Sequence, residues 1–282
     1  MHPLMETYLQ YLINHGRKRG TLKSYRAGLE RACEILEPMG LTTDPRRMTA
    51  EEAFIIKDAL GCKEASARLY IKVVKLCCDH YHNPRFGEAD ILWNRPTRSV
   101  HWIDEDQYRE LLDGAPPPVR IFLVLGGLMG LRCLEIVQLT VDDIHADTLR
   151  VIGKGHGAGL IMEQPMPPAV KAELVRYLRW RADQPAGSRR LLWWGTERAT
   201  DPEHLENVAY MHIVKYAREK GIAMSPHALR RFYATTLYRK GADLVTISKL
   251  MRHASVETTQ RYIRDDPEAI RDAAALMASF LE

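Results

Sequence analysis

The stretch from Ile121 to Leu134 constrains the fold of this chain most, because Arg132 is its only charged residue. Residues 119–129 are predicted to form a very apolar helix, which belongs in a protein core. Arg132 follows that helix closely, and burying a guanidinium without a partner is costly. It therefore requires either an internal carboxylate or an external anion. Glu135, one helical turn further on, is a candidate partner that would also aim the guanidinium.

A glycine-rich hairpin is predicted in the next part of the chain, where residues 141–165 have β character. Leu149 to Ile152 and Leu160 to Glu163 have the composition of strands, and four glycines lie in the segment between them. Lys154 lies in this segment, where a flexible tip would bring it onto a ligand. A solvated, charged turn is the alternative interpretation.

A later helix start brings a histidine and an arginine together. Ser225 as N-cap and Pro226 at the first helical position predict a helix that begins here. His227 and Arg230 are three residues apart and therefore share one face of its N-terminal end. An anion at that end would meet a guanidinium, an imidazole and the helix dipole together.

Close to the C-terminus, His253 lies nine positions before Tyr262. A phenol has a pKa of about 10, so a tyrosine is a poor nucleophile until other groups take its proton and neutralise its target. A buried structural tyrosine needs no such neighbours. The pair therefore indicates a tyrosine that attacks a phosphate, provided that the basic groups described above gather around it.

The N-terminal third is predicted to be a small all-α domain. Four short helices are expected, over residues 5–13, 21–36 with Thr21 as N-cap, 49–60 with Thr49 as N-cap in a capping box, and 66–80. Residues 81–101 are irregular and form the best domain boundary. From residue 183 to 207 the chain is again expected to be rich in loops.

The excess positive charge of the chain lies in this third. Residues 1–98 contain 16 Lys and Arg against 12 Asp and Glu, and the rest of the 40 basic and 36 acidic residues balance. This imbalance favours a polyanionic partner, with a solvated surface as the alternative. The candidates for phosphate contacts are Lys23, Arg26, Arg68 and Lys72 on the helices, and Arg95 and Arg98 in the irregular segment.

Taken in order, six residues resemble the catalytic set of the tyrosine recombinases, also called the phage integrase family: Arg132, Lys154, His227, Arg230, His253 and Tyr262. Residues 130–136, 227–231 and 253–262 match the three boxes of that family. The resemblance implies a mainly α fold with a small β-sheet. A helical, SAM-like DNA-binding domain would span residues 1–95, and an α+β catalytic domain would span residues 102–282 and end in a tail helix.

The resemblance also implies a reaction. Tyr262 would attack a DNA phosphate to give a 3′-phosphotyrosine, and Lys154 would protonate the leaving 5′-oxygen. Arg132 and Arg230 would hold the non-bridging oxygens and supply the charge stabilisation that other phosphoryl-transfer enzymes obtain from Mg²⁺. No metal or cofactor is therefore expected.

The remaining roles fall to histidines, and the sequence departs from the family pattern nearby. His227 would accept the proton of the tyrosine, and His253 would donate a hydrogen bond to the phosphate. Arg252 stands where the family usually has glycine, which adds charge beside the site. Cys133 replaces a residue that is often basic or polar, and His156 is a possible second hairpin contact.

Other features have simpler interpretations. Tyr233 and Tyr238 are rival nucleophiles, but they lie in the apolar body of their helix and are expected to pack. The five cysteines are expected to be reduced. Cys77, Cys78, His80 and His82 cluster, but their spacing fits no common zinc pattern, and a core position is the favoured interpretation for the cysteines.

The functional expectation is a site-specific recombinase that acts on double-stranded DNA as a homo-oligomer, in integration and excision of a mobile element. Chromosome-dimer resolution of the Xer type, a type IB topoisomerase and a catalytically silent DNA-binding protein are the alternatives. No apolar run approaches the roughly 18 residues that a membrane span requires, and no export signal opens the sequence. A cytoplasmic location is therefore expected.

Overall fold

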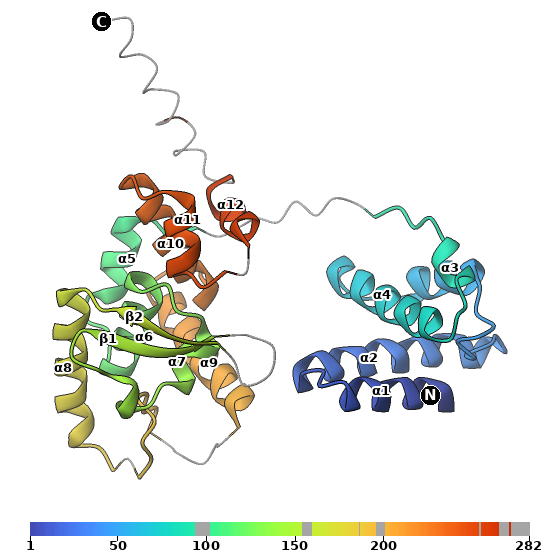
Figure 1. Cartoon of the computed structure of the whole chain (residues 1–282), viewed down its shortest axis with the longest axis horizontal. Coiled ribbons are helices and arrows are strands. Elements are labelled where there is room, and N and C mark those ends of the chain that lie inside the picture. Colours follow the sequence, from blue (N-terminus) through green and yellow to red (C-terminus); the bar gives the residue numbers. More distant parts are fainter. Residues whose placement is uncertain are drawn as a thin grey trace, which may run out of the picture. The chain divides into compact units, whose positions relative to one another are not determined.

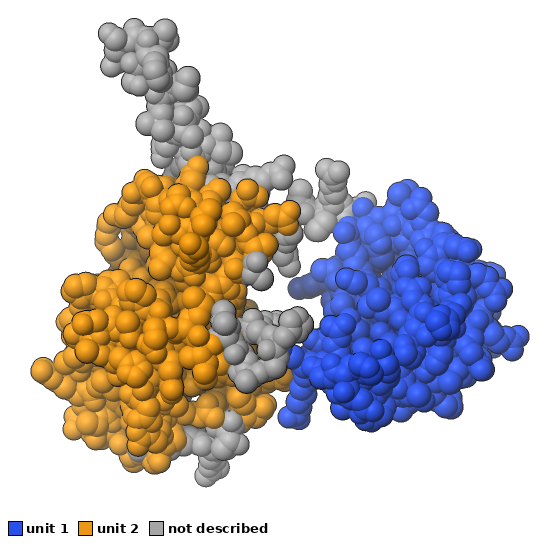
Figure 2. All heavy atoms as spheres, viewed as in Figure 1, with its two compact units in different colours: residues 1–98 blue, residues 99–282 orange. Residues whose placement is uncertain are grey.

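The computed structural model divides into two compact units, residues 1–98 and residues 99–282 (Figures 1 and 2). It describes residues 1–93, 102–153, 160–185, 187–195, 201–253, 255–264 and 271, with the backbone alone for residues 160 and 261–264. Each unit has its own hydrophobic core. The described part is mainly helical with one small sheet, which confirms the predicted fold class.

Unit 1 is entirely helical over its described residues. Its elements are α1 (Pro3–Asn14), α2 (Arg19–Leu36), η1 (Glu37–Met39), α3 (Ala50–Ala59), α4 (Glu64–His80) and η2 (Arg85–Glu88). Helices α2 and α4 pack closely at Gly28, where an added β carbon would lie 3.1 Å from Cδ1 of Tyr70. Cys77 and Cys78 are fully buried in this core, as the sequence predicted.

Two helix starts in unit 1 tested the capping predictions. Thr49 caps α3 in a capping box with Glu52, whose Oε2 accepts hydrogen bonds from the Thr49 amide (2.7 Å) and hydroxyl (2.6 Å). The prediction of Thr21 as the N-cap of α2 was wrong. The amide of Leu22 donates to the carbonyl of Lys18 at 3.0 Å, and this bond closes a helical turn that already contains Thr21.

Unit 2 contains the sheet and the longer series of helices. Its described elements are α5 (Glu105–Leu112), α6 (Pro117–Leu128), α7 (Cys133–Gln138), η3 (Val141–Asp143), β1 (Thr148–Gly153), β2 (Leu160–Pro165), α8 (Pro168–Ala182), α9 (Pro202–Glu219), α10 (Pro226–Arg239), α11 (Leu244–Leu250) and α12 (Val256–Arg264). Helix α6 is the centre of this unit and packs against α5, α7, α8, α9 and α10. Its apolar composition suits this position, because eight of its twelve residues are buried and none is exposed.

The sheet is a two-stranded antiparallel hairpin, in which Val151 pairs with Met162. Leu149 and Val151 alternate toward the core and are fully buried, so one face of β1 joins the core of unit 2. The expectation of β structure from residue 141 was wrong. Residues 141–143 form a 3-10 turn, because Asp143 accepts hydrogen bonds from the amide and the hydroxyl of Thr140.

The second correction in unit 2 concerns α9. The loop expected over residues 183–207 ends earlier, since α9 already begins at Pro202. Asp201 caps this helix through its carboxylate, which accepts from the amide of His204 at 3.4 Å, and Pro202 occupies the first helical position. The predicted tail helix over residues 267–280 lies outside the described residues, apart from residue 271. Among the described helices, none combines the length and the apolar character that crossing a membrane requires.

Two glycines let α6 and the segment after it approach α10 closely. A β carbon on Gly126 would lie 2.8 Å from Cδ1 of Leu229. A β carbon on Gly130 would lie 2.3 Å from Cδ1 of Tyr233, and Gly130 also has φ of +63°, which favours glycine. The backbone just before Arg132 is thereby held against the helix that carries Arg230.

Candidate active site

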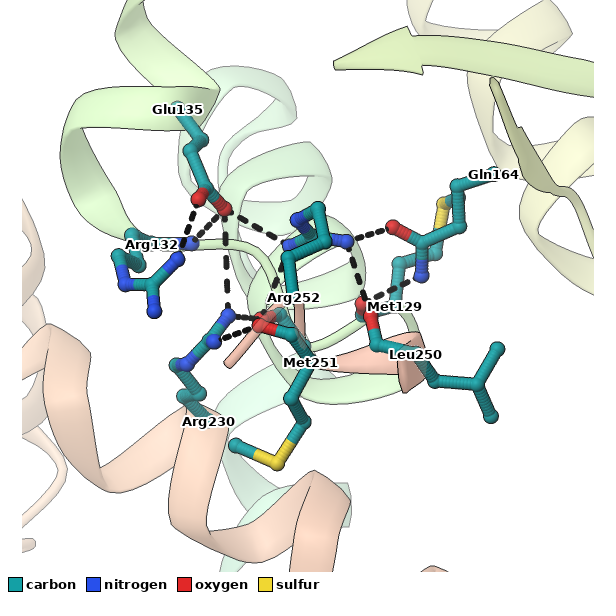
Figure 3. A network of polar contacts seen from close by, with 9 residues as sticks. Met129, Arg132, Glu135, Gln164, Arg230, Leu250, Met251 and Arg252 are labelled. Atoms are coloured by element: carbon teal, nitrogen blue, oxygen red, sulfur yellow. Dashed lines mark hydrogen bonds and ion pairs between the residues drawn. The ribbon is translucent and has the colours of Figure 1, made fainter. Parts of the chain in front are cut away.

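The site is built where α7, α10 and the end of α11 meet. Arg132 is the N-cap of α7, Arg230 lies one turn inside α10, and His253 follows α11. Figure 3 shows the guanidiniums of Arg132 and Arg230 directed toward the carboxylate of Glu135. The fold therefore brings together three of the predicted catalytic residues, although Arg132 precedes His253 by 121 positions in the sequence.

Arg132 is held by the carboxylate of Glu135, as the sequence predicted. Its Nη1 donates to Oε1 of Glu135 at 2.7 Å, and its backbone amide donates to Oε2 at 2.8 Å. The Arg132 side chain is 31% exposed, whereas that of Glu135 is only 3% exposed. A buried carboxylate thus anchors an arginine whose guanidinium stays accessible to an anion.

Arg230 is the largest fully buried side chain of the described residues. Its Nη1 donates to the carbonyl of Gly130, and its Nη2 donates to the carbonyl of Met251. The nearest oxygen of Glu135 lies 3.9 Å from Nη1. Two backbone carbonyls therefore fix the plane of this guanidinium, and the only carboxylate paired with it in the described part of the chain lies at the limit of an ion pair.

A third guanidinium, that of Arg252, completes the cluster. Its Nη2 lies 2.8 Å from Oε2 of Glu135, and its Nη1 donates to Oε1 of Gln164 on β2. Burial alone would raise the pKa of Glu135, but Arg252 and Arg132 outweigh it and hold that pKa below its usual range. Glu135 is therefore ionised at neutral pH, and three guanidiniums share one negative charge.

His253 is neutral at physiological pH. Burial and the positive charges of Arg230, Arg132 and Arg252 lower the pKa of His253 to about 4, with a smaller contribution from His227. His227 itself is exposed near the start of α10.

The ring of His253 is oriented by α12. Its Nδ1 lies 2.7 Å from Oγ1 of Thr259, which is fully buried. Donation of a hydrogen bond to a phosphate requires the proton on Nε2, so the Thr259 hydroxyl must donate to Nδ1 in that state.

The other two predicted catalytic residues are less completely described. Tyr262 lies on α12, which packs against α10 and α11, but its side chain is outside the described residues. Lys154 and His156 lie between β1 and β2 in the sequence, and both are outside the described residues. The rivals Tyr233 and Tyr238 pack in a hydrophobic cluster with Ile247 and Met251, as predicted.

The predicted DNA contacts of unit 1 lie on α2 and α4. Lys23 and Lys72 are exposed. Arg26 forms ion pairs with Glu6 and Glu30, and Arg68 forms one with Glu64. Surface pairs of this kind are weak and exchange readily for another anion. Arg95 and Arg98 lie outside the described residues.

Sequence reasoning missed two members of the site and underrated a third. Gln164 is buried at 5% exposure and donates to the carbonyl of Met129 at 2.8 Å, but no sequence pattern in β2 predicts this contact. Thr259 was one of several small polar residues between His253 and Tyr262. Arg252 was interpreted only as additional charge beside the site. An arginine next to a predicted catalytic histidine could also have indicated an internal carboxylate partner.

The fold is that of a tyrosine recombinase, and comparison with known proteins agrees. The family model described as the phage integrase family matches residues 101–269. The chain therefore belongs to the phage integrase family, which confirms the resemblance found in the sequence. Among the described residues no group of three or more His, Cys, Asp or Glu side chains is placed to hold a metal ion.

Two relatives named as tyrosine recombinases match over nearly their whole length. Tyrosine recombinase XerC of Chromohalobacter salexigens is 29% identical, over 97% of this chain and 94% of that protein. Tyrosine recombinase XerA of Pyrococcus furiosus is 26% identical, over 96% and 92%. A lambda integrase dimer bound to a COC′ core site has the same fold, with a TM-score of 0.73, 18% identity, and coverage of 95% of this chain and 96% of that one.

Proposed function

We propose that this chain is a site-specific DNA recombinase that cleaves and rejoins DNA through a 3′-phosphotyrosine on Tyr262, in the integration and excision of a mobile element. The observation that supports it best is the convergence of Arg132, Arg230 and His253 around the buried carboxylate of Glu135. That arrangement presents fixed positive charge and a neutral imidazole beside the helix that carries the tyrosine.

The chemistry follows from the charges of these groups. The phenolic oxygen of Tyr262 attacks phosphorus while the bond to the 5′-oxygen breaks. Arg132 and Arg230 stabilise the charge on the non-bridging oxygens, since guanidiniums match phosphate geometry. The proton of the phenol passes to His227, and the leaving 5′-oxygen takes a proton from Lys154.

Rejoining is the reverse reaction. A free 5′-hydroxyl attacks the phosphotyrosine and releases the phenol, so the energy of the phosphodiester is conserved and no ATP is consumed. His253 donates a hydrogen bond to the phosphate in both directions, because its low pKa keeps it uncharged and its ring orientation is fixed by Thr259. A neutral donor suits a site in which three guanidiniums already supply positive charge.

The partner that we propose is double-stranded DNA with a specific site, bound by a dimer and recombined by a tetramer. Unit 1 would act as the DNA-binding domain, with Lys23, Arg26, Arg68, Lys72, Arg95 and Arg98 on phosphates. Lambda integrase, whose fold is similar, has been solved as a dimer bound to a core site and as a tetramer bound to a Holliday junction. The compartment that we propose is the cytoplasm.

A second candidate function is chromosome-dimer resolution of the Xer type. It is favoured by the relatives named XerC, XerA and XerD, which the chain matches over more than nine tenths of their length. Sequencing of the DNA that flanks the gene separates the two functions. Paired short repeats at the borders of an inserted element support integration, and their absence together with a single chromosomal site supports dimer resolution.

The decisive test of the enzyme activity is a covalent trap. The full-length protein is incubated with a nicked duplex selected from a random-sequence library by binding to this protein. We expect a covalent 3′ adduct that resists denaturation and that Tyr262→Phe abolishes. Wild-type protein that binds the duplex but forms no adduct would support the catalytically silent alternative. Relaxation of a supercoiled plasmid without that site would support a topoisomerase.

A further inference from the structure

The backbone of Arg252 adopts an unusual conformation. Its φ is +55°, a left-handed backbone conformation that residues other than glycine rarely adopt. Among the described residues, His82 is the one other non-glycine residue with positive φ, and it is exposed on unit 1. The Arg252 side chain, by contrast, is only 2% exposed. A strained backbone that carries a buried cation requires compensating contacts.

Those contacts come from three separate segments (Figure 3). The guanidinium of Arg252 pairs with Glu135 of α7 at 2.8 Å, donates to Gln164 of β2, and donates to the carbonyl of Leu250 at 3.0 Å. Gln164 in turn donates to the carbonyl of Met129. Arg252 therefore links α7, the end of α11 and a strand of the hairpin that contains Lys154.

Arg252 and Arg230 share acceptors. Both approach Oε2 of Glu135, with Arg252 at 2.8 Å and Arg230 at 3.9 Å. Both also donate to the carbonyl of Gly130, Arg252 at the longer distance of 3.5 Å. The short ion pair on Oε2 thus belongs to Arg252, and the charge of Arg230 is offset less by that carboxylate.

We propose that Arg252 is a positioning residue that occupies Oε2 of Glu135 and thereby leaves the positive charge of Arg230 available to the scissile phosphate. This inference rests on the proposed function. Without Arg252, Glu135 would be left with Arg132 and Arg230 alone, and its Oε2 would attract Arg230 into a closer pair. The net positive charge of the cluster would also fall by one.

Substitutions at this position separate charge from backbone and volume. Arg252→Met keeps the β carbon and much of the volume but removes the charge, and Arg252→Lys keeps the charge. Arg109→Met is the matched control, because Arg109 is an exposed arginine of α5 that pairs with Glu105 and Asp106. Each full-length variant is compared in covalent adduct formation under single turnover and in equilibrium binding of the same duplex.

The expected result is a fall of about 10- to 100-fold in the adduct rate of Arg252→Met, with duplex binding little changed. Arg252→Lys should recover most of the rate, and Arg109→Met should match the wild type. A wild-type rate for Arg252→Met, or equal losses for Met and Lys, overturns the inference. The proposed function fails separately, if the wild-type protein itself forms no adduct.

A double-mutant cycle tests whether Arg252 acts through Glu135. If it does, Arg252→Met should slow adduct formation much less in a Glu135→Gln background than in the wild type, and additive losses contradict the inference. Should Arg252→Met fail to fold, Gln164→Leu tests the same network, because it removes an acceptor that fixes the guanidinium. A reduced adduct rate with normal binding supports the inference, and an unchanged rate overturns it.

Discussion

Nδ1 of His253 lies 2.7 Å from Oγ1 of Thr259, a hydroxyl that is fully buried on α12. A neutral imidazole donates a hydrogen bond from one nitrogen and accepts at the other. The hydroxyl can pair with Nδ1 in either tautomer, and when it donates to Nδ1 the imidazole proton lies on Nε2. Helix α12 also carries Tyr262, so one helix orients the histidine and presents the nucleophile.

The first prediction concerns this hydroxyl. Thr259→Val keeps the shape of the side chain but removes the donor to His253. We expect adduct formation to slow by about tenfold or more, since the imidazole loses the hydrogen bond that orients its ring, while duplex binding is retained. The control is Thr258→Val, because Thr258 is the exposed neighbouring threonine. Equal rates for the two variants would show that Thr259 has no part in orienting the imidazole.

The second prediction concerns the glycine that precedes the site. Gly130→Ala places a β carbon 2.3 Å from Cδ1 of Tyr233, on a backbone with φ of +63°. We expect a loss of about 2–4 kcal/mol in the free energy of unfolding, measured with urea. Gly241→Ala is the control for backbone strain alone, because Gly241 has φ of +87° and nothing within 4 Å of the added carbon. If both variants lose the same stability, the contact with Tyr233 is not the cause.

Much of the fold was accessible from the sequence because its signals are local. The capping box at Thr49, the start of a helix at Pro226 and the apolar segment that became α6 each depend on residues within a few positions. The errors have the same origin. Thr21 is a good N-cap by type, but the turn already closed at Lys18.

Some residues of the site were predictable from the sequence, but most of the contacts between them were not. Arg132 in an apolar segment predicted a carboxylate partner, and Glu135 was close enough in the sequence to be identified as that partner. The pairing of that carboxylate with Arg252 joins residues 117 positions apart, and Gln164 enters from a strand 88 positions before Arg252. Such contacts depend on how α7, β2 and α11 pack, which no local pattern encodes.

The third prediction concerns the acid stability of unit 2. Glu135→Gln removes the buried negative charge that three guanidiniums share. We therefore expect the free energy of unfolding at neutral pH to fall by about 3–5 kcal/mol. The folded pKa of Glu135 is lowered, so its contribution is complete above the unfolded pKa of about 4.3 and is lost as pH falls through the folded value. The measurement is urea unfolding of both proteins from neutral pH downward. If the difference in free energy of unfolding between wild type and variant stayed constant below the unfolded pKa, Glu135 would not be the source of the acid sensitivity.

The fourth prediction concerns the protonation of His253. Burial and the charges of Arg230, Arg132 and Arg252, with a smaller contribution from His227, lower its pKa to about 4, from an unfolded value of about 6.5. Between these values the unfolded chain binds the extra proton, so His253 reduces stability as pH falls through that window. An NMR titration of its ring in the full-length protein should give a midpoint near 4. Because Arg252 contributes to the lowering, Arg252→Met should raise the midpoint, whereas the distant Arg109→Met should leave it in place. A wild-type midpoint above 7 would mean that the imidazole is mostly charged at neutral pH, and the assignment of a neutral donor to the phosphate would be wrong.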